Sequence, residues 1–388
     1  MKKLLIFTAF ICLTSLASAQ WIQAGLNSEK VNCLAVSGNN IFAGTNNGVF
    51  LSSNNGKQWN AVNSGLSYGS GIMSLAISGN YIFAGTDGNG VYVSANNGQH
   101  WKSKNSGITS NSLDVSALII NDTNLFAATP DGVFLSTNNG NIWNKADSGL
   151  TGNGFFAFTA DESNIFVGGY GGVYISSNNG GYWHRSSLGL PSPYPFVYAL
   201  AIIGSDIYVG TLDGVYMSSN NGANWSSQNN GMPPNKGVSA LTISDNKIFA
   251  GFPACGVYLS ANNGINWTEI NYGLTNFNVK DLAICNDTLF AGTFDGVWKL
   301  SLSGAGIAGI LNNESNITVY PNPTKDKLTL ESLQKSSIKI LNIQGQTIFQ
   351  QPIQQGKTDI DISGLAKGVY ILRLYSNYKT AVTKIVKE

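Results

Sequence analysis

Ser52-Ser53-Asn54-Asn55-Gly56-Lys57-Gln58-Trp59 begins a pattern that organises most of this chain. The pattern Ser-x-Asn-Asn-Gly-x-x-Trp occurs six times, ending at Trp59, Trp101, Trp143, Trp183, Trp225 and Trp267. Shortly before each copy, and once more near residue 297, the chain reads Gly-Val followed by an aromatic residue, and these seven segments recur every 40 or 42 residues. A repeat of this length implies one supersecondary unit used many times.

Each repeat also contains two apolar segments, such as Val31 to Val36 and Ile41 to Gly44, ahead of its Gly-Val pair. A period of about 40 residues that holds four short strands is typical of a β-propeller blade. We therefore predict an all-β fold with a seven-bladed β-propeller over residues 20–300.

The seventh repeat lacks its own Ser-x-Asn-Asn-Gly-x-x-Trp copy, which would fall near residue 309. The segment from Trp21 to Leu26 resembles the stretch that follows each pattern, for example Trp59 to Leu66. We predict that this N-terminal segment is the outer strand of the last blade and closes the ring, so that no sheet edge stays open.

The composition also favours strands and turns. Charged residues make up 11% of the 388 residues, against about 25% in an average domain, and glycine occurs 45 times. The formal net charge is +1, and it becomes about −1 if Lys2 and Lys3 are removed with a leader. This balance predicts no nucleic-acid partner and no electrostatic attraction to anionic lipid.

The first 19 residues have the pattern of a secretory signal peptide. Lys2 and Lys3 precede an apolar run, and Ala17-Ser18-Ala19 fits a signal peptidase site, so the mature chain should begin at Gln20. The alternative, a membrane anchor, needs an apolar stretch of about 20 residues, and this run is shorter. We expect no stable membrane insertion.

Three cysteines follow the leader: Cys33, Cys255 and Cys285. Their odd number argues against a disulfide framework, and neither they nor His100 and His184 have the spacing of metal ligands. We predict no metal site and no cofactor.

At this point the repeat resembles a known family. Ser52 to Trp59 is similar to the Asp-box, or BNR repeat, of sialidase-type propellers, written Ser-x-Asp-x-Gly-x-x-Trp, and the resemblance covers about residues 20–300. Every copy has asparagine at the aspartate position, namely Asn54, Asn96, Asn138, Asn178, Asn220 and Asn262. Asparagine keeps the carbonyl that caps a tight turn. The resemblance implies a structural box on the face opposite the ligand site.

Catalysis can be examined by counting residues. Sialidases hold the substrate carboxylate with three arginines, whereas Arg185 is the only arginine of the predicted propeller, so the sequence argues against sialidase activity. Other glycosidases need two facing carboxyl groups, and most acidic residues here, such as Asp131, Asp213 and Asp295, occupy turn positions of the repeat. We assign no catalytic residue, and enzymatic activity stays an open question.

Asp281 stands out among the innermost strands. Its register holds only small residues in the other blades: Cys33, Ser74, Ala117, Ala157, Ala199 and Ala240. Two interpretations of Asp281 stay open. In the first it is structural, either solvated in the channel or paired with Lys280 or a backbone amide. In the second it contacts a ligand or an ion, with Asp114 as its companion.

Aromatic residues concentrate in the hairpins before each Gly-Val pair and in the connections between blades. We name Tyr170, Tyr194, Phe252 and Phe277 as candidate ligand-binding rings, together with Asp281. Exposed rings beside polar edges suit a glycan or a protein surface. The alternative is that these rings only cover loops or pack between blades.

The period fails over residues 301–316, which read as a linker, and residues 317–388 read as a small Ig-like β-sandwich. This segment, with Tyr320-Pro321-Asn322-Pro323, a Gly-Val-Tyr strand and a basic end, resembles the type A C-terminal sorting domain of the Bacteroidota type IX secretion system. The resemblance implies that residues 317–388 engage the type IX secretion machinery and that the protein is secreted or displayed outside the outer membrane. The alternative is a stable sandwich that is retained for binding.

We predict a secreted or cell-surface propeller that acts as a binding module for an unknown glycan or protein ligand. Two alternatives stay open: a glycoside hydrolase or lyase of the Asp-box type, and a structural or assembly factor. Two carboxylates in one pocket would favour the hydrolase, an aromatic groove would favour binding, and a broad flat patch would favour the assembly factor.

Overall fold

A computed structural model describes residues 20–109, 113–191, 195–302, 318–332, 336–342, 346–376 and 379–388. The predicted signal peptide and linker residues 303–316 lie outside this part, and the predicted domain limits stay predictions. No helix in the described part is long and apolar enough to span a membrane. Seven four-stranded antiparallel sheets and a C-terminal sandwich confirm the predicted fold class.

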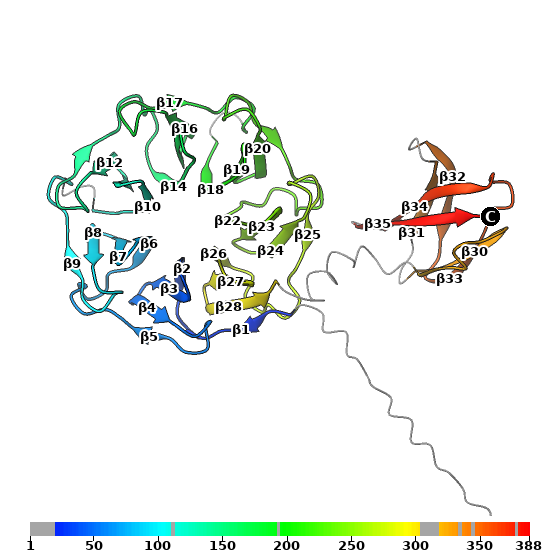
Figure 1. Cartoon of the computed structure of the whole chain (residues 1–388), viewed down its shortest axis with the longest axis horizontal. Coiled ribbons are helices and arrows are strands. Elements are labelled where there is room, and N and C mark those ends of the chain that lie inside the picture. The colour runs from blue at the N-terminus through cyan, green and yellow to red at the C-terminus, as the bar shows by residue number, and fades with distance from the viewer. Residues whose placement is uncertain are drawn as a thin grey trace, which may run out of the picture.

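The seven sheets form a closed ring, and we call the axis that their innermost strands surround the channel (Figure 1). The innermost strands are β2 (Val31–Ser37), β6 (Ile72–Ser78), β10 (Ala117–Asn121), β14 (Phe155–Ala160), β18 (Val197–Ile203), β22 (Ala240–Ser244) and β26 (Val279–Cys285). The second strands are β3 (Asn40–Thr45), β7 (Tyr81–Thr86), β11 (Asn124–Thr129), β15 (Ile165–Gly169), β19 (Asp206–Thr211), β23 (Lys247–Phe252) and β27 (Thr288–Thr293).

The third strands are β4 (Gly48–Ser52), β8 (Val91–Ser94), β12 (Gly132–Ser136), β16 (Gly172–Ser176), β20 (Gly214–Ser218), β24 (Gly256–Ser260) and β28 (Gly296–Ser301). The outer strands of the first six blades are β5 (Asn60–Ala61), β9 (Lys102–Ser103), β13 (Asn144–Lys145), β17 (His184–Arg185), β21 (Ser226–Ser227) and β25 (Thr268–Glu269). The seventh blade takes its outer strand from the N-terminus: β1 (Ile22–Gln23) pairs with β28.

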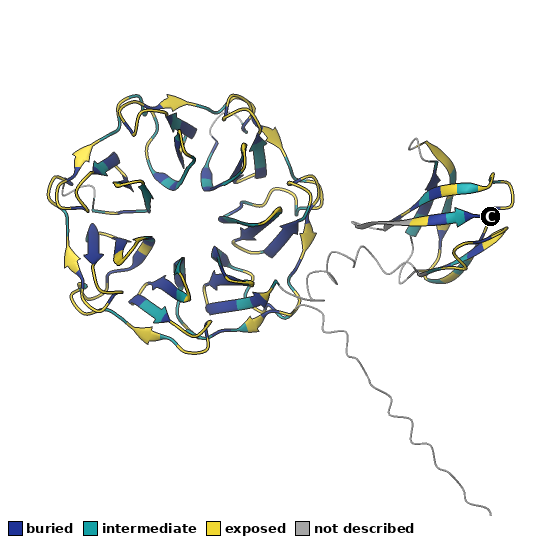
Figure 2. Cartoon of the chain, viewed as in Figure 1, coloured by how far each residue is buried: buried dark blue, intermediate teal, exposed yellow. Residues whose placement is uncertain are grey.

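In the second strand of each blade every residue is buried, except the first residue of the strand in most blades. Both faces of this strand pack against the neighbouring blades, which explains its near-continuous apolar sequence. Exposed residues gather instead on the outer strands and the loops (Figure 2). The core is therefore a ring of apolar layers between blades, with the channel at its centre.

The asparagine box forms the turn between the third and outer strands. In the first blade, Asn54 Oδ1 accepts hydrogen bonds from Gln58 N at 2.9 Å and Ser52 Oγ at 3.1 Å. Asn55 and Gly56 have positive φ angles of 57° and 74°, which asparagine and glycine tolerate. The carbonyl oxygen thus performs the capping role that an aspartate oxygen would perform, without a charge.

The box tryptophans join neighbouring blades. Each indole Nε1 donates a hydrogen bond of 2.6 to 2.9 Å to a backbone oxygen of the preceding blade. The donor and acceptor pairs are Trp59 and Ala24, Trp101 and Val62, Trp143 and Lys104, Trp183 and Ala146, Trp225 and Ser186, Trp267 and Gln228, and Trp21 and Ile270. Trp21 supplies the bond that the seventh blade would otherwise lack.

The C-terminal domain consists of two facing sheets. One contains β29 (Thr318–Tyr320), β30 (Lys327–Ser332) and β33 (Gly356–Asp361). The other contains β32 (Thr347–Ile353), β31 (Ser336–Leu341), β34 (Gly368–Ser376) and β35 (Lys379–Lys387). Leu328, Ile338, Ile360, Leu372 and Ile385 belong to a core that both sheets share. This domain has its own apolar core, as an independently folding sandwich requires.

We predict that Trp21→Ala destabilises the propeller by about 3 to 5 kcal/mol, the usual cost of truncating a buried tryptophan. Trp21 is 1% exposed and bonds to Ile270, whereas Ile22 in the same strand is 60% exposed, so Ile22→Ala is the matched control. Thermal melting of the two variants provides the measurement. Equal melting temperatures would show that the N-terminal strand does not hold the ring closed.

Candidate functional site

One face of the propeller carries the hairpins between the second and third strands, and we call it the hairpin face. Each innermost strand begins there, because its first residues pair with the last residues of the second strand, as Val31 does with Thr45. The asparagine boxes follow the third strand and so lie on the opposite face, the box face.

A one-residue bulge marks the start of five innermost strands. The register shifts between Val31 and Cys33, and the same shift recurs in four other blades. The bulged residues are Asn32, Met73, Phe156, Tyr198 and Lys280, and Ser116 and Ser239 hold the corresponding place in the remaining two blades. These seven bulge positions form a ring at the hairpin-face mouth of the channel, and bulges of this kind often re-aim side chains next to functional sites.

Three bulge positions connect adjacent blades. Asn32 Nδ2 donates to Ile72 O at 3.1 Å, and Ser239 Oγ donates to Val279 O at 2.7 Å. Ser116 Oγ donates in the same way to Phe155 O. In each case the acceptor directly precedes the bulge position of the next blade. A small polar side chain is therefore sufficient to satisfy the fold here.

The other four bulge positions hold large side chains: Met73, Phe156, Tyr198 and Lys280. Two of them build a ring cluster, which we define as Phe156, Tyr170, Phe196 and Tyr198. The Phe156 ring stacks on Tyr198 at 5.4 Å between centroids and meets Tyr170 edge-on at 4.8 Å. Tyr170 also meets Phe196 edge-on at 4.9 Å and pairs with it through a backbone bridge. The cluster joins the fourth and fifth blades.

The ring cluster is partly open to solvent. Tyr170 is 40% exposed, and the other three rings are half-buried. Burial, and to a smaller extent the electrostatic interaction with Tyr170, raises the pKa of Tyr198. This phenol therefore stays a neutral hydrogen-bonding group. The cluster thus combines apolar ring faces with two phenol groups on neighbouring blades.

A second group lies at the junction of the seventh and first blades, and we call it the lysine pair. Lys30 directly precedes β2, and Lys280 is the bulge residue of β26. Their ammonium groups lie 4.8 Å and 5.1 Å from the centroid of the same ring, Phe294. Burial and, secondarily, the charge of Lys30 lower the pKa of Lys280.

Asp281 occupies the register position that the sequence indicated, since it pairs with Gly292 as Cys33 pairs with Gly44. Its two oxygens accept hydrogen bonds from Leu34 N at 2.7 Å and Leu282 N at 2.8 Å. Leu34 belongs to the first blade, so the carboxylate holds the two ends of the ring together. This arrangement agrees with the structural alternative, a backbone-amide partner.

Burial raises the pKa of Asp281 from 3.8 to about 6, although both backbone hydrogen bonds act in the opposite direction. The proposed companion Asp114 lies elsewhere, beside Gly88 of the second blade. Within the described residues, no three His, Cys, Asp or Glu side chains gather as metal ligands would. Asp281 thus contributes to ring closure.

The four predicted rings have different outcomes. Tyr170 belongs to the ring cluster, and Phe277 is exposed on a connection at the hairpin face. Tyr194 lies outside the described residues. The expectation of an exposed ring is wrong for Phe252, which is 0% exposed and packs edge-on against Tyr258 at 5.1 Å. Phe252 ends its second strand, where five other blades have a buried threonine.

Phe156, Tyr198 and Lys280 belong to the candidate site, although the sequence analysis did not name them. The signal was available, because each lies one residue before the small-residue register of Cys33 and Asp281. Strand alternation in the sequence does not reveal the bulge, because the register shift arises only where the first two strands of a blade pair.

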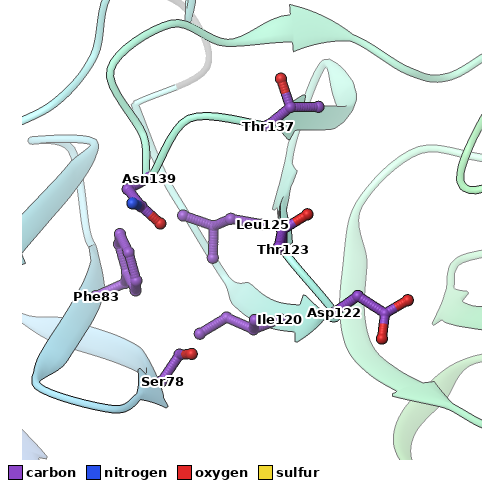
Figure 3. Close-up of a pocket in the computed structure, with 8 residues that line it drawn as sticks. All are labelled: Ser78, Phe83, Ile120, Asp122, Thr123, Leu125, Thr137 and Asn139. Carbon is purple, nitrogen blue, oxygen red and sulfur yellow. The ribbon is translucent and has the colours of Figure 1, made fainter.

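Two cavities add further surface. One, of about 260 Å³, lies between the second and third blades on the box face (Figure 3). Phe83, Ile120 and Leu125 form its apolar wall, and Asp122 is its one carboxylate, directed away from Phe83. The other, of about 380 Å³, lies on the hairpin face beside Tyr68 and contains no carboxylate. Neither cavity brings two carboxylates together.

We predict that Asp281→Asn changes the pH dependence of stability. The carboxyl group of Asp281 binds its proton more tightly in the folded state, where its pKa is about 6, than in the unfolded chain, where it is near 3.8. The contribution of Asp281 to the unfolding free energy therefore falls as the pH rises from about 4 to about 6. The total change should be of the order of 3 kcal/mol. Urea unfolding at several pH values measures it.

Asp287→Asn is the control for this measurement, because Asp287 lies exposed in the turn between β26 and β27. Between these pH values the unfolding free energy should fall less in Asp281→Asn than in the unmodified protein, whereas Asp287→Asn should show the full decrease. An unchanged slope in the Asp281 variant would contradict the assignment.

Comparisons with known proteins agree with this architecture. Residues 318–388 match the family described as the secretion system C-terminal sorting domain. No curated protein matches the chain. Among solved structures, PorZ, a surface component of the type IX secretion system of Porphyromonas gingivalis, is 17% identical with a TM-score of 0.57, over 92% of this chain and 59% of PorZ.

Two further structures share the fold. The extracellular domain of BT4673 from B. thetaiotaomicron is 17% identical with a TM-score of 0.63, over 85% of this chain and 47% of that one. YCF48 bound to a D1 peptide is 13% identical with a TM-score of 0.60, over 74% of this chain and 96% of that one. This chain thus spans only about half the length of PorZ and BT4673. The chain is a secreted seven-bladed β-propeller that ends in a type IX secretion system C-terminal sorting domain, which directs it to the cell surface or beyond.

Proposed function

We propose that the propeller is a binding module whose ligand is a glycan and whose site is the hairpin-face mouth of the channel. The observation that carries this proposal is the ring cluster at the bulge positions. Asn32, Ser116 and Ser239 satisfy the fold at the same place, so the large rings of Phe156 and Tyr198 are not needed for closure.

The chemistry of the cluster suits a sugar. Aromatic ring faces cover the apolar C–H face of a pyranose, and polar groups at their edges bond to its hydroxyls. In the ring cluster, the hydroxyls of Tyr170 and Tyr198 provide the polar groups, and the half-buried rings of Phe156 and Phe196 lie beside them. Met73 and Phe277 extend the apolar surface around the same mouth, since each is exposed at this face.

A protein ligand is the second candidate, because the YCF48 structure contains a bound peptide on a propeller of the same fold. That similarity supports the fold alone, so the peptide serves here as an outcome to test. A glycoside hydrolase would need two facing carboxylates, and the two cavities hold one and none. The ring cluster therefore favours binding over hydrolysis.

The sorting domain has a separate partner. Membership of this family implies an interaction with the type IX secretion machinery. The sandwich would then be the secretion signal, and the propeller would be the exported domain that binds its ligand outside the cell.

We predict that Tyr170→Ala and Tyr198→Ala each weaken glycan binding by about tenfold or more, the loss expected from a central aromatic contact. Binding on a glycan array, followed by titration of the best glycan, provides the measurement. Tyr182→Ala is the matched control, since Tyr182 is 45% exposed on the box side, close to the 40% of Tyr170. Melting curves distinguish lost contacts from unfolding.

Undiminished binding in both cluster variants would remove the ring cluster as the site. Binding of a peptide library in preference to every glycan, with the same sensitivity to Tyr170→Ala, would replace the glycan by a protein ligand at the same surface.

We also predict that deleting residues 318–388 prevents the protein from reaching the cell surface while leaving a folded propeller inside the outer membrane. The physical reason is that the two domains have separate apolar cores. Protease accessibility on intact cells, compared with the full chain, is the measurement. Equal surface amounts of both proteins would show that the sorting signal lies elsewhere.

A further inference from the structure

We propose that the lysine pair at Phe294 is an anion subsite that binds the carboxylate of an acidic sugar. This inference rests on the proposed glycan function and narrows it to glycans that contain a uronic acid or another carboxylated residue. Lys30 and Lys280 would contact the carboxylate, and Phe294 would lie against the sugar ring.

The two ammonium groups of the lysine pair lie close to one aromatic ring on the hairpin face. Both approach one ring, at 4.8 Å and 5.1 Å from its centroid, and both side chains are half-buried. Phe294 itself is exposed at the tip of the hairpin between β27 and β28. The pair therefore lies on the hairpin face, around the same channel mouth as the ring cluster.

Neither lysine of the pair has a carboxylate partner among the ion pairs of the described residues. Within the described residues, the two ion pairs are Lys145 with Asp147 and Lys387 with Asp326, so neither member of the lysine pair has one. Like charges brought together at a half-buried site repel each other, and the lowered pKa of Lys280 reflects both burial and that repulsion. A bound anion would relieve this cost.

The carboxylates that lie close along the chain are engaged elsewhere. Glu29 Oε2 accepts from Asn47 Nδ2 at 2.9 Å, and Asp295 Oδ1 accepts from Ser28 N at 2.8 Å. Asp281, the next residue after Lys280, holds the amides of Leu34 and Leu282. Each acid has a local structural partner, and none of them pairs with the lysines.

The fold does not require a lysine at the bulge position of the seventh blade. Ser239 and Asn32, in the blades on either side of Lys280, donate to the next blade from this position. Lys280 could be replaced by such a residue without loss to the fold, yet it places a cation at the mouth. Because Glu29 and Asp295 lie nearby, a singly charged carboxylate suits the pair better than a doubly charged phosphate.

The test uses selective isotope labelling of lysine in the full protein and NMR titration with glucuronate, with glucose as the neutral control. We expect glucuronate to shift the ε-methylene signals of Lys30 and Lys280, and glucose at the same concentration to leave them unchanged. Lys280→Met and Lys30→Met keep the apolar stem and remove the charge. Each should weaken glucuronate binding by about tenfold or more, the loss expected for one charge-assisted hydrogen bond.

Lys247→Met is the matched control, because Lys247 is also half-buried but begins β23 at the box face. Absence of a glucuronate-dependent shift at both lysines would overturn the proposal. Equal shifts with inorganic phosphate, or stronger shifts with N-acetyl-triglycine, would overturn the sugar assignment in favour of a general anion site or a peptide carboxylate. The two proposals can fail separately: if neutral glycans bind through Tyr170 and Tyr198 while glucuronate shifts neither lysine, the anion subsite is overturned and the glycan function stands.

Discussion

The indole-to-carbonyl hydrogen bond between neighbouring blades is the interaction on which this structure depends. It occurs once per blade, always from a tryptophan to a backbone oxygen of the blade before it. A buried indole needs a partner for its N–H, and a ring of blades needs the same contact at every junction, including the one between its ends. Trp21 meets both needs at the last blade, because β1 lies against β28.

Ring closure concentrates specific contacts at one junction. There the first and seventh blades are joined by Asp281 with Leu34, by Lys299 Nζ with Asn55 O at 2.9 Å, and by Asn286 Nδ2 with Asn39 Oδ1 at 3.3 Å. The lysine pair occupies the hairpin-face end of the same junction. A repeat protein can place unique residues at such a point, since the first three strands of the seventh blade meet a blade from the other end of the propeller sequence.

The bulge positions hold two types of side chain that make different contacts. A small polar residue at this place bonds to the next blade, whereas a large residue leaves that bond aside and extends toward the channel mouth. Four blades have the large type, and these supply two of the four rings of the ring cluster and one member of the lysine pair. The rigid seven-bladed ring thus holds variable side chains in fixed positions, which is the arrangement that the proposed binding function requires.

The sequence by itself determined the blade number, the C-terminal sandwich and its sorting role, because a repeat every 40 to 42 residues and a compact terminal motif are visible without any long-range contact. It also singled out Asp281 as exceptional and named Tyr170, which belongs to the ring cluster. Only the tertiary structure decided that Phe252 is buried, that Asp281 bonds to the first blade, and that Phe156, Tyr198, Lys30 and Lys280 reach the mouth. The physical reason is that these features depend on contacts between segments that are distant in the sequence. Asp281 bonds to the first blade from the seventh, and the bulges at Phe156, Tyr198 and Lys280 exist only where the innermost and second strands pair in the folded sheets.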